Sequence, residues 1–134
     1  MNNCIFCKIA QGQIPSHKIY EDEFTYAFLD INPATKFHTI VIPKAHCVNI
    51  LDASADIFLK VMGTVKHITD LYSKKLPMAN LQIIHNAGEH AQQEVPHMHI
   101  HIVPRSKNDN QNLGWYKPNP EYVEEFDQLL QLIK

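Results

Sequence analysis

The chain has no run of apolar residues near the length of a membrane span. A spanning helix needs about 20 such residues in succession, so the sequence predicts no membrane partner. The chain also lacks an excess of positive charge, because 12 basic residues stand against 14 acidic residues and the formal net charge is −2. Binding to nucleic acids in general depends on such an excess, and we therefore expect no nucleic-acid partner.

Two further absences bear on the cellular compartment. Residues 1–4 include neither the basic segment nor the long apolar segment of a secretory signal. The cysteines do not form an even set, since they are Cys4, Cys7 and Cys47. An odd count with a Cys-x-x-Cys pair does not predict a disulfide framework. We expect a cytoplasmic protein in which Cys4 and Cys7 bind a metal, take part in redox chemistry or remain free thiols.

The composition that is present is typical of one globular domain of 134 residues, with 45% hydrophobic and 19% charged residues. Two-residue alternation and turn residues predict strands at residues 19–21, 25–30, 38–43, 81–85 and within 95–105. A helical period predicts a long helix over residues 54–75, capped by Asp52 or Ser54, and a proline signals a C-terminal helix from residue 120. Residues 4–11 are expected to form a short helix or turn.

Short connections between the predicted strands favour an antiparallel arrangement. We therefore expect an α+β fold in which an antiparallel sheet of about five strands carries one long helix and a C-terminal helix. One domain spans residues 1–134, with a core at 4–105 and a C-terminal extension at 106–134.

Three histidines alternate with apolar residues near the end of this core. On a strand, His97, His99 and His101 would share one face while Met98, Ile100 and Ile102 point into the core. The residues alone leave three interpretations open. The histidines are exposed and without a role, or they bind a metal, or a neutral imidazole acts as a nucleophile near pH 7.

The run from His97 to Val103 resembles the His-φ-His-φ-His-φ-φ signature of the histidine-triad (HIT) family of nucleotide hydrolases and transferases. The resemblance covers residues 4–105 and is closest to small bacterial members near the purine nucleotide phosphoramidases. Further segments that follow the family pattern in order are Cys4 to Ile9, Ile14-Pro15, Tyr20 to Asp22, Ala27 to Ile31, His38, Val41 to Lys44, His46 and Asn86-x-Gly88.

The resemblance implies a HIT-like fold and an enzyme that cleaves purine nucleotides, as phosphoramidates or adenylyl compounds, at the α-phosphate. His99 would attack phosphorus and form a nucleotidyl-histidine intermediate, with no metal required for catalysis. His101 would contact the phosphate or leaving group, and His38 would complete the proton network. The substrate-binding residues implied are Asp30 at the ribose, Asn86 and Gln93 at the phosphate, and Phe6, Ile9, Phe28 and Ile31 around the purine.

The resemblance also implies a structural zinc ion and a second copy of the chain. In zinc-bearing members the ligands correspond to Cys4, Cys7, His46 and His97, and a zinc-bound His97 would not transfer protons. The family usually forms a homodimer, and residues 57–72 and 79–84 are the segments we expect at its interface.

The chain departs from the family pattern in the loop before the triad. Gln92 stands where a glycine is usual, and Glu94 stands where a hydroxyl side chain is often found. Three alternatives to the phosphoramidase remain: a dinucleoside polyphosphate hydrolase, a nucleotide-binding or zinc-dependent interaction module with little turnover, and a metallohydrolase that uses all three histidines.

Overall fold

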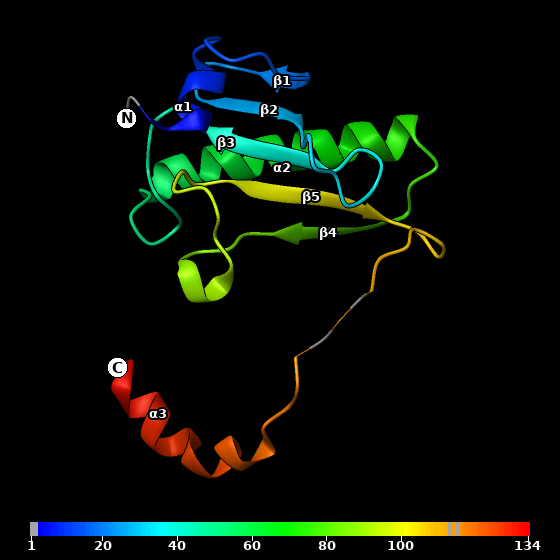
Figure 1. Cartoon of the computed structure of the whole chain (residues 1–134). Coiled ribbons are helices and arrows are strands. Elements are labelled where there is room, and N and C mark those ends of the chain that lie inside the picture. Colours follow the sequence, from blue (N-terminus) through cyan, green and yellow to red (C-terminus); the bar gives the residue numbers. More distant parts are fainter. Residues whose placement is uncertain (1–2, 113, 115) are drawn as a thin grey trace.

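A computed structural model describes residues 3–112, 114 and 116–134 of the chain. Its centre is one antiparallel sheet with the strand order β1-β2-β3-β5-β4 (Figure 1). The strands are β1 (Lys18–Glu21), β2 (Thr25–Leu29), β3 (Thr39–Pro43), β4 (Asn80–Ile84) and β5 (Ile100–Arg105). The predicted α+β class is confirmed, because every pair of neighbouring strands is antiparallel and the helices lie in separate segments of the chain.

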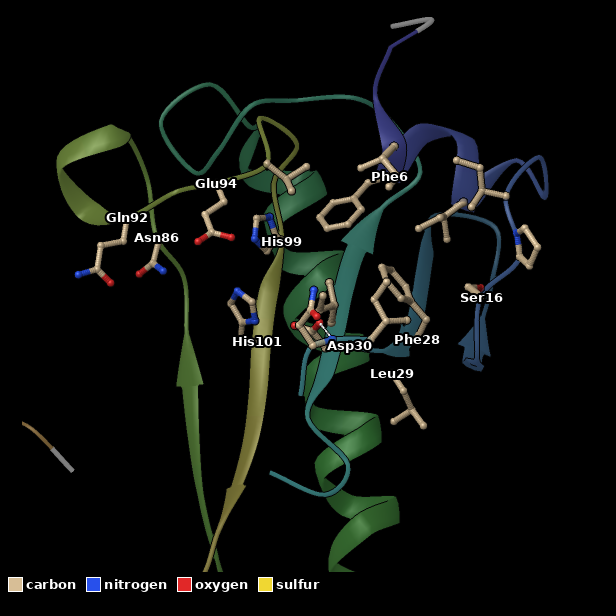
Figure 2. Close-up of a pocket in the computed structure, with 18 residues that line it drawn as sticks. Phe6, Ser16, Phe28, Leu29, Asp30, Asn86, Gln92, Glu94, His99 and His101 are labelled. Carbon is tan, nitrogen blue, oxygen red and sulfur yellow. Dashed lines mark hydrogen bonds between the residues drawn. The ribbon is translucent and has the colours of Figure 1, made fainter. Parts of the chain in front are cut away.

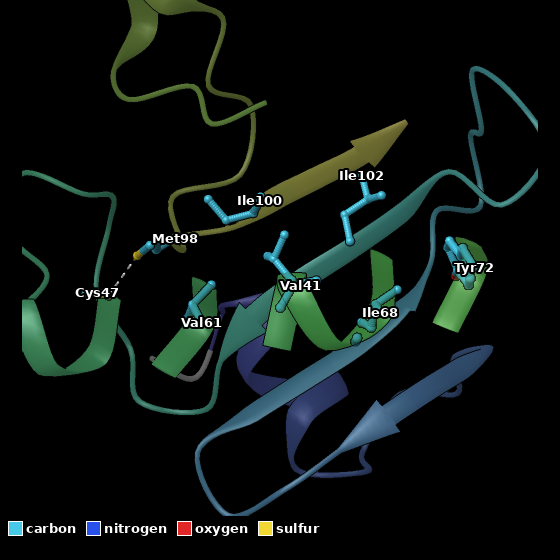
Figure 3. Packing of buried hydrophobic residues seen from close by; sticks show 10 residues of the cluster. Val41, Cys47, Val61, Ile68, Tyr72, Met98, Ile100 and Ile102 are labelled. Atoms are coloured by element: carbon cyan, nitrogen blue, oxygen red, sulfur yellow. Dashed lines mark hydrogen bonds between the residues drawn. The ribbon is translucent and has the colours of Figure 1, made fainter. Parts of the chain in front are cut away.

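The long helix α2 (Ala55–Lys75) covers one face of the sheet. It begins where the sequence predicts, since the Ser54 side chain accepts a hydrogen bond from the backbone N–H of Ile57. Its apolar stripe packs on the strand residues that point toward it, and together they form a buried cluster that includes Val41, Ile100 and Ile102 (Figure 3). In the described part of the chain, no helix is both long enough and apolar enough to cross a membrane.

The opposite face of the sheet carries a second buried cluster. The alternation within the strands turns Tyr26, Phe28, Ile40 and Ile42 to this side, where they contact the short helix α1 (Ile5–Ala10). Phe6 and Ile9 of α1 belong to the same cluster. Both faces of β2 and β3 are therefore buried, and the space beside α1 is left for the candidate site.

The histidine run is not one continuous strand. β5 begins only at Ile100, because the chain turns at Val95 to His97, where the His97 N–H donates to the Val95 carbonyl at 2.9 Å. Met98 then bonds through its N–H to the Cys47 carbonyl at 2.7 Å, and its side chain enters the core as expected. Only His101 of the three histidines lies within the strand, so the prediction of one strand through all three is corrected.

The C-terminal segment forms a 3-10 helix, η2 (Pro120–Glu125), followed by the helix α3 (Phe126–Leu132). Figure 1 shows both lying apart from the sheet. The apolar face expected on this segment is present but exposed, with Tyr122, Phe126 and Leu130 each about half accessible. In the segments 57–72 and 79–84 that we expect at a dimer interface, the core takes Val61, Val65, Ile68 and Tyr72, whereas Leu59, Leu71 and Ile83 are exposed.

Candidate active site

A cavity of about 420 Å³ opens on the sheet face opposite α2. Its volume falls in the range of small-ligand sites. The residues expected around a nucleotide gather here, and those that line the cavity are Phe6, Ile9, Phe28, Asp30, Ile31, Asn86, His99 and His101. Figure 2 shows Phe6 and Phe28 on one side of the two histidines, and Asn86 on the other.

The hydrogen bonds of His99 determine which ring nitrogen faces the cavity. Its Nδ1 lies 2.7 Å from the carbonyl oxygen of His97, an atom that only accepts, so Nδ1 carries the proton and donates. Nε2 then keeps its lone pair. The ring is held further by the edge of Phe6, whose centroid lies 5.1 Å away. His99 therefore presents an oriented, unprotonated nitrogen beside the cavity.

A second series of hydrogen bonds determines which nitrogen of His101 carries the proton. The backbone N–H of Ala34 donates to Nδ1 of His38 at 3.0 Å, so the proton of neutral His38 sits on Nε2. That Nε2–H lies 2.9 Å from Nδ1 of His101, which therefore accepts. The remaining proton of His101 is on Nε2, as a donor for a bound anion. His38 thus acts on the site through His101.

Burial keeps these imidazoles uncharged. Loss of contact with water is the main cause that lowers the pKa of His99, and the hydrogen bond to His97 opposes it. The same cause, followed by the neighbouring His99 and His38, lowers the pKa of His101 to about 4. Burial also lowers the pKa of His38, against the opposing effect of Asp30. The neutral ring is the form that can attack phosphorus.

Asp30 provides the carboxylate on the apolar side of the cavity. Its Oδ1 accepts the backbone N–H of Asn32 at 2.8 Å, and its Oδ2 lies 3.5 Å from Nε2 of His38. The bond to Asn32 holds the side chain at the cavity wall while Oδ2 retains lone pairs for a ligand hydroxyl.

Gln93 lies elsewhere than expected. Its Oε1 accepts the N–H of Gly88 at 2.9 Å and the side-chain amide of Asn49 at 3.1 Å. Its Nε2 donates to the carbonyls of Val48 at 2.7 Å and Val95 at 2.9 Å. The side chain is used within the loop and does not line the cavity, so the structure does not bring it to a phosphate position. Its neighbours Gln92 and Glu94 line the cavity instead.

His85 is a supporting residue outside the set that the sequence predicts for the site. Its Nδ1 donates to the His99 carbonyl at 2.9 Å, and its Nε2 accepts the N–H of Ile50 at 3.1 Å. The backbone of His99 is therefore held from both sides, by His85 and by the turn at His97. The available signal was its position directly after β4, the strand that pairs with β5.

The cysteine pair meets two of the histidines beside α1. Cys4 and Cys7 lie with His46 and His97 so that one ligand atom from each falls within 4.8 Å of the others. The Nδ1 atoms of His46 and His97 are 3.2 Å apart, and Sγ of Cys7 lies 3.3 Å and 3.5 Å from them.

These separations fit the edges of a tetrahedral site. Zinc bonds of ordinary length place two nitrogens about 3.3 Å apart and a nitrogen and a sulfur about 3.5 Å apart. His97 is oriented for such a role, because its Nε2 donates to the Pro43 carbonyl at 2.9 Å and Nδ1 keeps its lone pair. Burial, and after it the neighbouring Cys4, raises the pKa of the Cys7 thiol to about 11. Protons would leave both thiols when a cation binds.

Comparison with known proteins agrees with this geometry. The HIT domain family matches residues 11–108. The chain is 35% identical over 132 residues to adenosine 5'-monophosphoramidase HNT1 of Saccharomyces cerevisiae, covering 98% of this chain and 78% of that protein. A crystal structure of a HIT family protein from Bacillus anthracis superposes with a TM-score of 0.90 at 36% identity, covering 98% of this chain and 95% of the other.

A Zn-bound histidine triad family protein from Mycobacterium smegmatis is also similar. Its TM-score is 0.78 at 32% identity, with 98% of this chain and 96% of that chain covered. The family match extends over most of the described sheet and includes His99 and His101. On the strength of that match, of the fold and of the identity to these relatives, the chain belongs to the HIT family.

Proposed function

We propose that this chain hydrolyses purine nucleotides at the α-phosphate, with phosphoramidates as its substrates, through a nucleotidyl intermediate on His99. The observation that carries the proposal is the pairing of a lone pair on Nε2 of His99 with an N–H on Nε2 of His101 at one cavity. The name of the yeast relative supports the phosphoramidate as substrate. In-line attack on phosphorus needs a nucleophile and a donor near the developing charge.

The reaction consists of two displacements. Nε2 of His99 forms a bond to phosphorus while the phosphorus–nitrogen bond breaks, and the amine leaves with the bonding pair and takes a proton from water. Water then attacks phosphorus, the bond to His99 breaks, and its electron pair returns to Nε2 as the water proton is released. One water molecule is added across the phosphorus–nitrogen bond. Nε2–H of His101 donates to the charge that develops in both steps.

The hydrogen bonds argue against a metallohydrolase, whether the metal is held by the three histidines of the triad or by a neighbouring cluster. Asp30, His38 and His101 do lie close enough to hold a cation. However, Nδ1 of His38 accepts the Ala34 N–H, so its Nε2 must carry a proton and has no lone pair for a metal. The side chain of His97 belongs to the cysteine cluster, so it does not share a metal with His99.

We propose zinc as the ion held by Cys4, Cys7, His46 and His97. Two sulfurs and two nitrogens form a closed set with no position left for a substrate, which is typical of structural sites. When bound, the ion supplies stability and no chemistry. It would tie α1, which carries Phe6, to the turn that orients His99.

We further propose that residues 4–105 act as the catalytic core of a homodimer and that residues 106–134 contribute to its association. The exposed apolar residues of η2 and α3, together with half-exposed Ile83 on the edge strand β4, support this arrangement. Exposed apolar side chains that lie together often mark an interface.

The test is to trap the intermediate. The protein is mixed with adenosine 5'-phosphoramidate, quenched in base, digested and analysed by mass spectrometry. We expect one adenylyl group on the peptide that contains His99, and none in His99→Ala, which should still bind AMP. His90→Ala is the matched control, because His90 is an exposed histidine of the preceding loop. An adduct on another residue, or AMP binding without turnover by the wild type, would refute the proposal.

A further inference from the structure

The two sides of the cavity differ in character. Figure 2 shows Phe6, Phe28 and Ser16 on one side of His99 and His101, and Gln92, Glu94 and Asn86 on the other. Under the proposed function, the apolar side takes the nucleoside and phosphorus lies at the histidines. The leaving group then meets the side that carries Glu94.

Glu94 is an uncompensated negative charge at this cavity. Its carboxylate lines the space with His99 and His101. No hydrogen bond or ion pair reaches it within the described part of the chain. Asp30 is the second carboxylate, and the described lining residues include neither lysine nor arginine. A site that receives a phosphate therefore has no cationic side chain to balance an additional anion.

The loop holds Glu94 in this position. Gln93, the residue before Glu94, is held by the four hydrogen bonds of its side-chain amide. One of these bonds ends on the carbonyl of Val95, the residue after Glu94. Gln92 takes a left-handed backbone conformation, with φ of 70°, which a residue with a side chain adopts only at a cost. The backbone on both sides of Glu94 is therefore constrained, and the side chain leaves it on the side of the loop that lines the cavity (Figure 2).

We propose that Glu94 selects the leaving group by charge, favouring amines that carry a further positive charge and rejecting anionic leaving groups such as a nucleoside polyphosphate. The inference rests on the proposed function and names the substrate class within it. An ammonium group on the leaving amine would supply the counter-charge that the cavity lacks. A polyphosphate would bring several negative charges toward the same carboxylate.

Coulomb's law sets the size of the effect. For two unit charges about 6 Å apart in a partly solvated site, the relative affinity changes by about tenfold. A cationic and an anionic leaving group of equal length should therefore differ by about 100-fold in kcat/KM, with a neutral one between them. The difference should shrink in high salt, because exposed charges are screened.

The experiment uses three adenosine 5'-phosphoramidates whose amines end in an ammonium, a methyl or a carboxylate group at matched length. The kcat/KM of each is measured for the wild type, Glu94→Gln and Glu94→Lys. We expect the cationic substrate to be favoured by the wild type, the three to fall within about threefold in Glu94→Gln, and the order to invert in Glu94→Lys. Glu89→Gln is the matched control, since Glu89 is an exposed carboxylate of the same loop outside the cavity lining.

The outcomes separate the two proposals. If the wild type hydrolyses all three substrates but its order is unchanged in both Glu94 variants, the charge-selection proposal is overturned and the proposed function stands. If the wild type hydrolyses none of them, the proposed function fails and this inference fails with it. Loss of folding is not expected, because Glu94 is exposed and the substitutions remove no hydrogen bond or ion pair among the described residues. Unfolding temperatures of the variants provide the check.

Discussion

Keeping His101 neutral should make the folded protein sensitive to acid. The ring has a pKa of about 4 in the fold, chiefly because of burial and next because of His99 and His38, and about 6.5 in an unfolded chain. Between these values the unfolded chain binds a proton that the folded chain does not. The contribution of this ring to the free energy of unfolding is therefore fully present above pH 6.5 and is lost as the pH falls toward 4.

The magnitude follows from the same two values. Each pKa unit corresponds to about 1.36 kcal/mol, so a fully shielded ring would lose about 3 kcal/mol over the window. Part of the His101 ring is exposed, and solvent reduces the effect by about half. We expect His101 alone to contribute a loss of about 1 to 2 kcal/mol between pH 7 and pH 4.5, a sizeable share of the stability of a small domain.

Urea unfolding at a series of pH values measures this loss. The wild type is compared with His101→Gln, which keeps a polar side chain of similar reach but cannot titrate. We expect the stability of the variant to fall less steeply with acid than that of the wild type. His17→Gln, at an exposed position, should follow the wild type. Parallel curves for the wild type and His101→Gln would contradict this prediction, because the ring would then have the same proton affinity in the folded and unfolded states.

Three further perturbations probe separate parts of the molecule. Removing a bound metal with a chelator should lower the melting temperature by about 5 to 10 °C and weaken AMP binding, because Cys4 and Cys7 flank Phe6; calorimetry measures both, and no change in either would contradict the zinc proposal. Gln93→Ala should cost about 2 to 4 kcal/mol of stability through its four lost hydrogen bonds; an unchanged unfolding midpoint with a raised KM would instead indicate a direct phosphate contact. Truncation after residue 112 should convert a dimer into a monomer in sedimentation equilibrium while circular dichroism shows the sheet retained, and a monomeric full-length chain would dismiss the proposed role of the extension.

Local patterns accounted for much of the architecture. The spacing of Val61, Val65 and Ile68 was enough to predict α2, because a helix buries residues at its own period whatever it packs against. The alternation around Val41 and Ile100 predicted strands for the same reason. The resemblance to the family predicted that His99, His101, Asp30 and the apolar residues around the purine belong to one site, because the family motifs occur in a recognisable order.

The secondary-structure elements, their approximate bounds and the set of groups available for chemistry follow from the sequence alone, because helix and strand periods are properties of neighbouring residues. The position of the proton on His101 depends on the tertiary structure, since its partner His38 is 63 residues away and the two meet through strand register. The tertiary structure also turned Gln93 into the loop and left Glu94 at the cavity. Adjacent residues of an irregular loop point in directions that no period prescribes.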